Sequence, residues 1–150
     1  MLQLTQKETD LLKDMKDQER LCADKYTRHA QCACDPQLKN LFSQIATVEN
    51  EHWNTLDQIC RGTVPVPSGG GAAKPEFTAA DPSCCPAQCD DKYLCSDALA
   101  TEKHASHLYD TCIFEFADAN VRSLLNHIQK EEQEHGKMIY DYMAVNGMYC

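Results

Sequence analysis

The chain has 150 residues, enough for one domain with a buried core. It carries 14 Lys and Arg against 23 Asp and Glu, and the resulting net charge of −9 argues against a nucleic-acid or anionic-membrane surface. No eighteen apolar residues occur in succession, and the charged N-terminal segment lacks a signal-peptide pattern. We therefore expect a protein synthesised in a cytosol, with no nucleic acid and no membrane among its partners.

Helix signals and helical spacing of apolar residues predict four helices, near residues 5–33, 36–60, 91–116 and 119–145. Thr5 and Glu8 have the spacing of a capping box, and Asp35 is an N-cap followed by proline. Asp118 offers a second N-cap of this kind, and Gly147 follows the last helix as a stop. Short turns make the first two helices, and the last two, antiparallel hairpins.

The segment between the hairpins is a linker. Five of the six prolines and four of the six glycines fall between Gly62 and Pro86. The crossover, residues 61–90, has roughly 30 residues and can extend ~90 Å, against ~37 Å for a 25-residue helix. It can therefore run the length of a bundle as one long crossover, the connection found in ferritin-like folds.

The two hairpins resemble copies of one another. A shift of 83 positions aligns identical residues, namely Glu19 with Glu102, Tyr26 with Tyr109, Asp35 with Asp118, Glu49 with Glu132, Glu51 with Glu134 and His52 with His135. A helical hairpin cannot bury its own apolar stripe, so two copies must face each other. The sequence predicts an all-α, ferritin-like four-helix bundle, a single domain over 1–150 built from hairpins 5–60 and 91–145.

Polar residues interrupt the apolar stripe of every predicted helix. The first and third helices each contribute one carboxylate, and the second and fourth each contribute a Glu-x-x-His pair: Glu19, Glu102, Glu49 with His52, and Glu132 with His135. Each carboxylate lies 15 residues from its hairpin turn, taken at Cys34 or Ala117. All four should therefore share one level of the bundle, with the histidines one turn away.

Four buried ionised carboxylates are costly unless they are protonated or neutralised by cations. Two divalent ions supply the required charge, and this ligand set is that of di-iron and di-manganese carboxylate proteins. Oxygen and imidazole ligands favour two divalent ions of Fe or Mn, with Zn possible. The alternative is that these glutamates lie on solvated helix faces. Tyr26 and Tyr109 lie two turns from the single carboxylates, either as hydrogen-bond donors to them or as core aromatics.

The second half of the chain resembles the Coat F family of bacterial endospore coat proteins. The resemblance rests on the Thr-Glu-Lys-His motif at 101–104, Glu115, the segment 122–125, Glu132 with His135, and the Gly-x-Tyr ending at 147–149. It covers residues 95–150 well and 8–60 more weakly, through the repeat. It implies a ferritin-like fold and a place in the spore coat, after synthesis in the mother-cell cytoplasm.

The helices also resemble rubrerythrin, whose ferritin-like domain binds two irons and reduces peroxide. The six residues of the ligand set fall on that pattern. The chain departs from it at Leu99, where rubrerythrin has an additional glutamate, and it has no rubredoxin module with paired Cys-x-x-Cys. The resemblance therefore implies simpler di-metal chemistry rather than the rubrerythrin peroxidase route.

Ten cysteines are unusual for a protein made in a reducing compartment. Cys22 and Cys112 lie on core stripes and should be buried thiols. The other eight should be exposed and are disulfide candidates, within the chain or between chains: Cys32, Cys34, Cys60, Cys84, Cys85, Cys89, Cys95 and Cys150. A zinc site from the four cysteines between 84 and 95 is an alternative. His29, His104, His107 and His127 match no ligand pattern and should be surface residues.

Two functions follow from these patterns. The first is a structural spore coat protein that forms homo-oligomers or a larger, disulfide-linked assembly with other coat proteins. Its bundle would carry the di-metal site. The second is a di-metal oxidoreductase that acts on peroxide, superoxide or oxygen. The sequence leaves open whether the site is catalytic.

Overall fold

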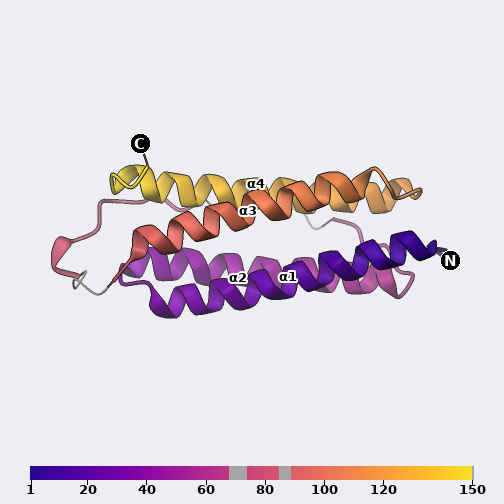
Figure 1. Cartoon of the computed structure of the whole chain (residues 1–150), viewed down its shortest axis with the longest axis horizontal. Coiled ribbons are helices and arrows are strands. Elements are labelled where there is room, and N and C mark those ends of the chain that lie inside the picture. The colour runs from indigo at the N-terminus through magenta and orange to yellow at the C-terminus, as the bar shows by residue number, and fades with distance from the viewer. Residues whose placement is uncertain (68–73, 85–88, 150) are drawn as a thin grey trace.

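The computed structural model describes residues 1–67, 74–84 and 89–149 (Figure 1). These residues form α-helices, one short 3₁₀ turn and no strand: α1 (Gln6–Cys32), α2 (Pro36–Cys60), η1 (Pro82–Cys84), α3 (Asp91–Ile113) and α4 (Ala119–Val145). Helix α1 lies along α2, and α3 lies along α4, so the chain forms two helical hairpins that face each other. The prediction of an all-α four-helix bundle from two hairpins is confirmed.

The helix ends follow the predicted capping residues. At the start of α1 the Thr5 amide donates to the Glu8 carboxylate at 2.7 Å, and the Glu8 amide donates to the Thr5 hydroxyl at 3.2 Å. Asp35 accepts from the second backbone amide of α2, and Asp118 does the same for α4. Gly147, with φ of +64°, takes the left-handed conformation that ends α4.

Helix α3 is shorter than the predicted range 91–116, because it ends at Ile113. The chain must turn there to reach the N-cap of α4, and the Arg122 side chain donates to the Phe114 and Phe116 carbonyls at 3.3 and 2.5 Å. Phe116 is fully buried although it lies outside the helix. The apolar stripe therefore continues past the helix that carries it, which is why spacing alone places the helix end too late.

The described parts of the linker lie at opposite ends of the bundle (Figure 1). Val64, just after α2, packs against the apolar cluster near the N-terminus. Phe77 instead packs against Tyr142 of α4, with ring centroids 5.5 Å apart, and the Ala80 amide donates to the Asn146 side chain at 2.8 Å. The connection between the hairpins therefore spans the length of the bundle, as the linker length predicts.

The apolar core consists of two clusters. One contains Tyr26, Phe42 and Tyr142, and the other contains Leu12, Phe116 and Leu125. Between these clusters the bundle interior is polar, because all four helices place charged side chains there. The fold thus holds a polar layer between two apolar ends.

Candidate metal centre

All six predicted ligands lie in the polar layer between the two clusters. Helices α1 and α3 contribute Glu19 and Glu102, and α2 and α4 contribute one Glu-x-x-His pair each. Each of the six residues is at most 3% exposed. The alternative of glutamates on solvated helix faces is therefore wrong for these four positions.

The six side chains form two overlapping groups of four, within which the ligand atoms lie within 4.8 Å of one another. One group has Glu19 and His52, and the other has Glu102 and His135. Glu49 and Glu132 belong to both groups. Each group could hold a cation, and Glu49 and Glu132 could contribute a carboxylate to either one.

The contacts of the two histidines follow the repeat. Nδ1 of His52 lies 3.1 Å from the Glu132 carboxylate, and Nδ1 of His135 lies 2.9 Å from the Glu49 carboxylate. Each histidine therefore faces the glutamate of the other hairpin. The imidazole rings stack with centroids 6.0 Å apart, and in each ring Nδ1 is the nitrogen that faces a glutamate of the other hairpin.

Several polar atoms of this layer are buried and have no hydrogen-bond partner among the described residues. They are Oε2 of Glu19, both carboxylate oxygens of Glu49, Oε2 of Glu102, Oε2 of Glu132 and Nδ1 of His135, the last of which lies 2.9 Å from Oε1 of Glu49 but without hydrogen-bond geometry. Unpaired buried polar atoms are costly, and carboxylates that face one another need protons or cations between them. Carboxylate oxygens and imidazole nitrogens are suitable donors for Fe, Mn or Zn. The residues fit a pair of divalent ions.

In the metal-free protein the glutamates pair as Glu19 with Glu49 and Glu102 with Glu132, and the proton of each pair favours one of the two carboxyl groups. Burial raises the pKa of Glu19 well above its usual value, and the contact with Glu49 raises it further. The pKa of Glu102 is raised in the same way by burial and by Glu132. Burial acts in this direction on Glu132 too, but contacts with Glu102 and His135 bring its pKa well below the usual value. The acid form therefore belongs to the α1 and α3 glutamates.

Both histidines favour the charged form. Burial alone would lower the pKa of His52, but its contacts with Glu131 and Glu132 raise the pKa well above the usual value. Contacts with Glu102 and Glu132 do the same for His135. Two imidazolium protons and two carboxyl protons carry four positive charges, the charge of two divalent ions.

The two predicted tyrosines contact the carboxylates. The Tyr26 hydroxyl donates to Oε1 of Glu102 at 2.5 Å, and the Tyr109 hydroxyl donates to Oε1 of Glu19. Both rings are fully buried in the apolar clusters. Each tyrosine thus serves in both predicted roles, since its ring is core and its hydroxyl orients a ligand from the opposite hairpin.

Sequence reasoning missed Glu131. Its carboxylate accepts from Nε2 of His52 at 3.1 Å, so both ring nitrogens of His52 have a carboxylate partner, Nδ1 with Glu132 and Nε2 with Glu131. The same carboxylate contacts His127. Glu131 lies beside the apolar stripe rather than on it, but the repeat pairs it with Val48. A carboxylate that breaks the repeat next to a predicted ligand is the signal that could have identified it.

Two of the four remaining histidines differ from the surface prediction. His29 is partly buried, contacts the Asp97 carboxylate at 2.9 Å and lies edge-on to the Phe42 ring. His127 is partly buried beside Glu131. Helix packing places these two side chains against neighbours that the stripe pattern does not reveal. His104 and His107 are exposed, as predicted.

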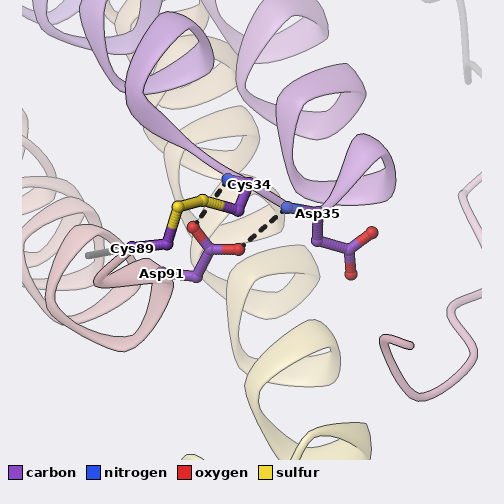
Figure 2. The surroundings of a disulfide bond; sticks show 4 residues. All are labelled: Cys34, Asp35, Cys89 and Asp91. Atoms are coloured by element: carbon purple, nitrogen blue, oxygen red, sulfur yellow. Dashed lines mark hydrogen bonds between the residues drawn. A yellow bond between two sulfur atoms is a disulfide. The ribbon is translucent and has the colours of Figure 1, made fainter. Parts of the chain in front are cut away.

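One disulfide joins two of the predicted candidates. Cys34, in the turn between α1 and α2, is bonded to Cys89, just before α3 (Figure 2). The Asp91 carboxylate accepts from the backbone amides of Cys34 and Asp35 at 2.9 and 3.0 Å, as Figure 2 shows. The bond and this carboxylate together attach the turn of the first hairpin to the start of the second.

The other cysteines divide by burial. Cys32 and Cys60 are exposed thiols, and Cys22 and Cys112 are buried thiols, as predicted. Cys95 is buried and unpaired, which corrects the prediction that it is exposed, and burial raises its pKa to about 12. It lies on the core face of α3, one turn inside the helix. Cys85, Cys150 and the side chain of Cys84 lie outside the described residues.

The alternative zinc site fails on two of its members. Cys89 is bonded to Cys34, and Cys95 is buried within an apolar cluster. A thiol that is oxidised to a disulfide and a thiol enclosed by apolar side chains cannot ligate one ion together. The zinc prediction for residues 84–95 is therefore wrong for this state of the chain.

Residues 90–149 match the family model of the Coat F domain. The part of the chain that is similar to this family therefore comprises α3, α4 and the turn between them. This match supports a structural protein of the spore coat and confirms the resemblance seen in residues 95–150. Searches among curated proteins and among solved structures found no match. None of the helices in the described ranges combines the length and apolar character that a membrane crossing requires.

Proposed function

We propose that this protein is a structural component of the spore coat whose helical bundle holds two divalent metal ions, Fe or Mn. The Coat F domain supports the location in the coat. The single observation that carries the metal centre is the set of buried, unpaired carboxylate oxygens that converge from all four helices. The long crossover between hairpins supports a single ferritin-like domain.

Each element of the centre has a defined task in this proposal. Glu19 with His52 would hold one ion and Glu102 with His135 the other, while Glu49 and Glu132 would bridge them. Tyr26 and Tyr109 orient the single carboxylates, and Glu131 orients His52. The bound ions would tie four helices together at one level, since binding to the folded state alone stabilises it.

Elemental analysis by mass spectrometry tests the metal centre. Protein purified without chelator or affinity metal should contain about two Fe or Mn per chain, and a His52→Ala/His135→Ala variant should lose them. The matched control is His104→Ala, because this histidine is exposed on α3 and is not among the six predicted ligands. Metal-free wild-type protein that also fails to bind added Fe²⁺ or Mn²⁺ would contradict the metal centre.

We also propose that the protein assembles with copies of itself and with other coat proteins, partly through disulfides. Cys32 and Cys60 support this proposal, because they are exposed thiols at the last residues of α1 and α2. Native material should run as larger species on non-reducing gels and as a monomer on reducing gels. Identical mobility under both conditions would contradict disulfide-linked assembly.

A second candidate function, di-metal oxidoreductase, is favoured by one observation. A cleft between α3 and α4 is lined by Glu102 and Glu132, so the centre borders a concave surface on which a small molecule could bind. Bound Fe or Mn would supply redox chemistry at this position. A metal-loaded protein that consumes peroxide, and loses this activity in both Glu49→Gln and Glu132→Gln, would favour the enzyme over the purely structural role.

A further inference from the structure

The outer face of the α3–α4 hairpin carries a cleft of about 470 Å³. Its lining includes Lys103, Ser106, His107, Gln129 and Gly136, together with two residues of the centre, Glu102 and Glu132. Each of these glutamates has an Oε2 atom that is buried and unpaired among the described residues. The cleft therefore borders the buried centre on this face of the bundle.

The equivalent face of the α1–α2 hairpin is covered. The repeat pairs Gly136 with Trp53, and the Trp53 ring lies beneath two cations, Lys16 and Arg20, at 4.7 and 4.6 Å from its centroid. Lys16 is fixed in turn by an ion pair with Asp57 at 2.6 Å. A surface depression on this side, lined by residues such as Ala23 and Thr27, includes none of the six predicted ligands in its lining.

All three parts of this cover are replaced in the second hairpin. The positions of Trp53, Lys16 and Arg20 correspond to Gly136, Leu99 and Lys103. The Leu99 side chain offers no charge to a ring, and no ring is present at position 136 to receive one.

The backbone does not require glycine at position 136. The residue lies within α4, its φ is not positive, and an added Cβ would meet only Leu99 Cδ1 at 3.6 Å, an ordinary contact. Glycine inside a helix costs about 1 kcal/mol relative to alanine. Because glycine has no side chain, the space that Trp53 fills in the other hairpin stays open at position 136.

We propose that the α3–α4 cleft is the entrance through which hydrated divalent metal ions reach the centre, and that the small residue at position 136 keeps it open. This inference rests on the proposed metal centre. His107 and Asp110, both exposed at the mouth of the cleft, offer an imidazole and a carboxylate to a passing cation. The first hairpin, closed by Trp53, contributes ligands but no entrance.

The rate of Co²⁺ uptake by metal-free protein, followed by stopped-flow absorbance, tests this entrance. Gly136→Trp recreates the side chain of the closed hairpin and should slow uptake about tenfold or more, since entry then requires the helices to move. The final stoichiometry should remain that of the wild type, because no ligand is changed. Ser106→Phe narrows the cleft from the α3 wall and should slow uptake in the same direction.

The matched control opens the other hairpin. Trp53→Ala removes the cover over the α1–α2 face and should take up Co²⁺ at least as fast as the wild type. Far-UV circular dichroism checks that each variant is folded. Because the two variants that narrow the cleft lie on different helices, the test still stands if one of them fails to fold.

The outcomes separate the two proposals. Wild-type protein that binds no Co²⁺ overturns the centre and the entrance together. Wild-type protein that binds Co²⁺, with folded Gly136→Trp and Ser106→Phe variants that bind it equally fast, overturns the entrance alone. Slower uptake in Trp53→Ala than in the wild type would also overturn it.

Discussion

The first hairpin, α1–α2, and the second, α3–α4, each place two glutamates and one histidine at the centre, and each histidine faces a glutamate of the other hairpin. Around the centre the hairpins differ. Trp53 corresponds to Gly136, and Val48 corresponds to Glu131. The two hairpins therefore have identical residues at the centre, where the four helices meet. They differ on their outer faces, where the α1–α2 face is covered by Trp53 and the α3–α4 face carries the cleft.

The two hairpin turns offer a second comparison. Asp91 at the start of α3 accepts from the amide of Cys34, and Glu8 near the start of α1 accepts from the amide of Ala117 at 2.9 Å. The repeat thus holds each turn with a carboxylate from the other hairpin. Only the first turn also carries a described disulfide, to Cys89. Both turns are therefore held by a carboxylate, and the first turn is held by a disulfide as well.

The largest expected effect concerns the shared centre. In metal-free protein, the folded state binds more protons near neutral pH than the unfolded chain, because the pKa values of His52 and His135 are raised. The free energy of unfolding should therefore fall as the pH rises from about 6.5, the unfolded histidine pKa, through the folded values. Loss of these protons leaves buried carboxylates uncompensated, which costs several kcal/mol per ion.

Thermal unfolding of chelator-treated protein between pH 5.5 and 8.5, followed by circular dichroism, measures this effect. The control is the Co²⁺-loaded protein, whose stability should rise over the same interval because metal binding requires deprotonated ligands. Metal-free protein that becomes more stable as the pH rises would contradict protonated histidines at the centre.

The second effect concerns the turn that carries the disulfide. Cys34→Ser/Cys89→Ser removes a cross-link across 55 residues, which should lower the free energy of unfolding by roughly 4 kcal/mol through the entropy of the unfolded chain. Urea denaturation in the absence of reductant measures it. Cys32→Ser/Cys60→Ser removes two exposed, unpaired thiols and serves as the control. Equal stability of the two double variants would show that the bond contributes nothing to the first turn.

Much of the fold follows from the sequence because the signals are local. The caps Thr5, Asp35 and Asp118 lie where the predicted helices begin, and the shift of 83 positions between the hairpins follows from identical residues. The end of α3 does not follow, since Phe116 continues the apolar stripe from outside the helix. The spacing of apolar residues predicts which side chains are buried, but it does not predict whether their backbone is helical.

The site divides in the same way. Six ligand candidates and two tyrosines lie on core stripes, so their periodicity directs them into the bundle, and the equal distance of the four glutamates from the hairpin turns predicts their common level. Glu131 contacts His52 from the edge of α4, where the spacing of polar residues carries no signal. The pairing of Cys34 with Cys89 was equally out of reach, because ten cysteines allow many pairings and only the fold selects among them.

The third effect concerns the carboxylate that only the second hairpin supplies. Glu131→Gln removes the charge that holds Nε2 of His52, and affinity for one of the two metal ions should fall about tenfold. A Co²⁺ titration should show one weakened and one unchanged site. Glu51→Gln is the control, because Glu51 is exposed and adjacent to His52 in sequence. Equal weakening of both sites would mean that Glu131 does not act through His52.

The smallest effect concerns the residue that keeps the cleft open. Gly136→Ala should raise the free energy of unfolding by about 1 kcal/mol, since alanine favours the helix and restricts the unfolded chain. Its Cβ meets only Leu99 at ordinary contact distance, so the cleft should stay open and Co²⁺ uptake should keep its wild-type rate. Gly147→Ala should have the opposite sign in urea denaturation, because φ of +64° strains a side chain there. Destabilisation by Gly136→Ala would mean that the glycine is required by packing, and the contrast with Trp53 would then need a structural rather than a functional cause.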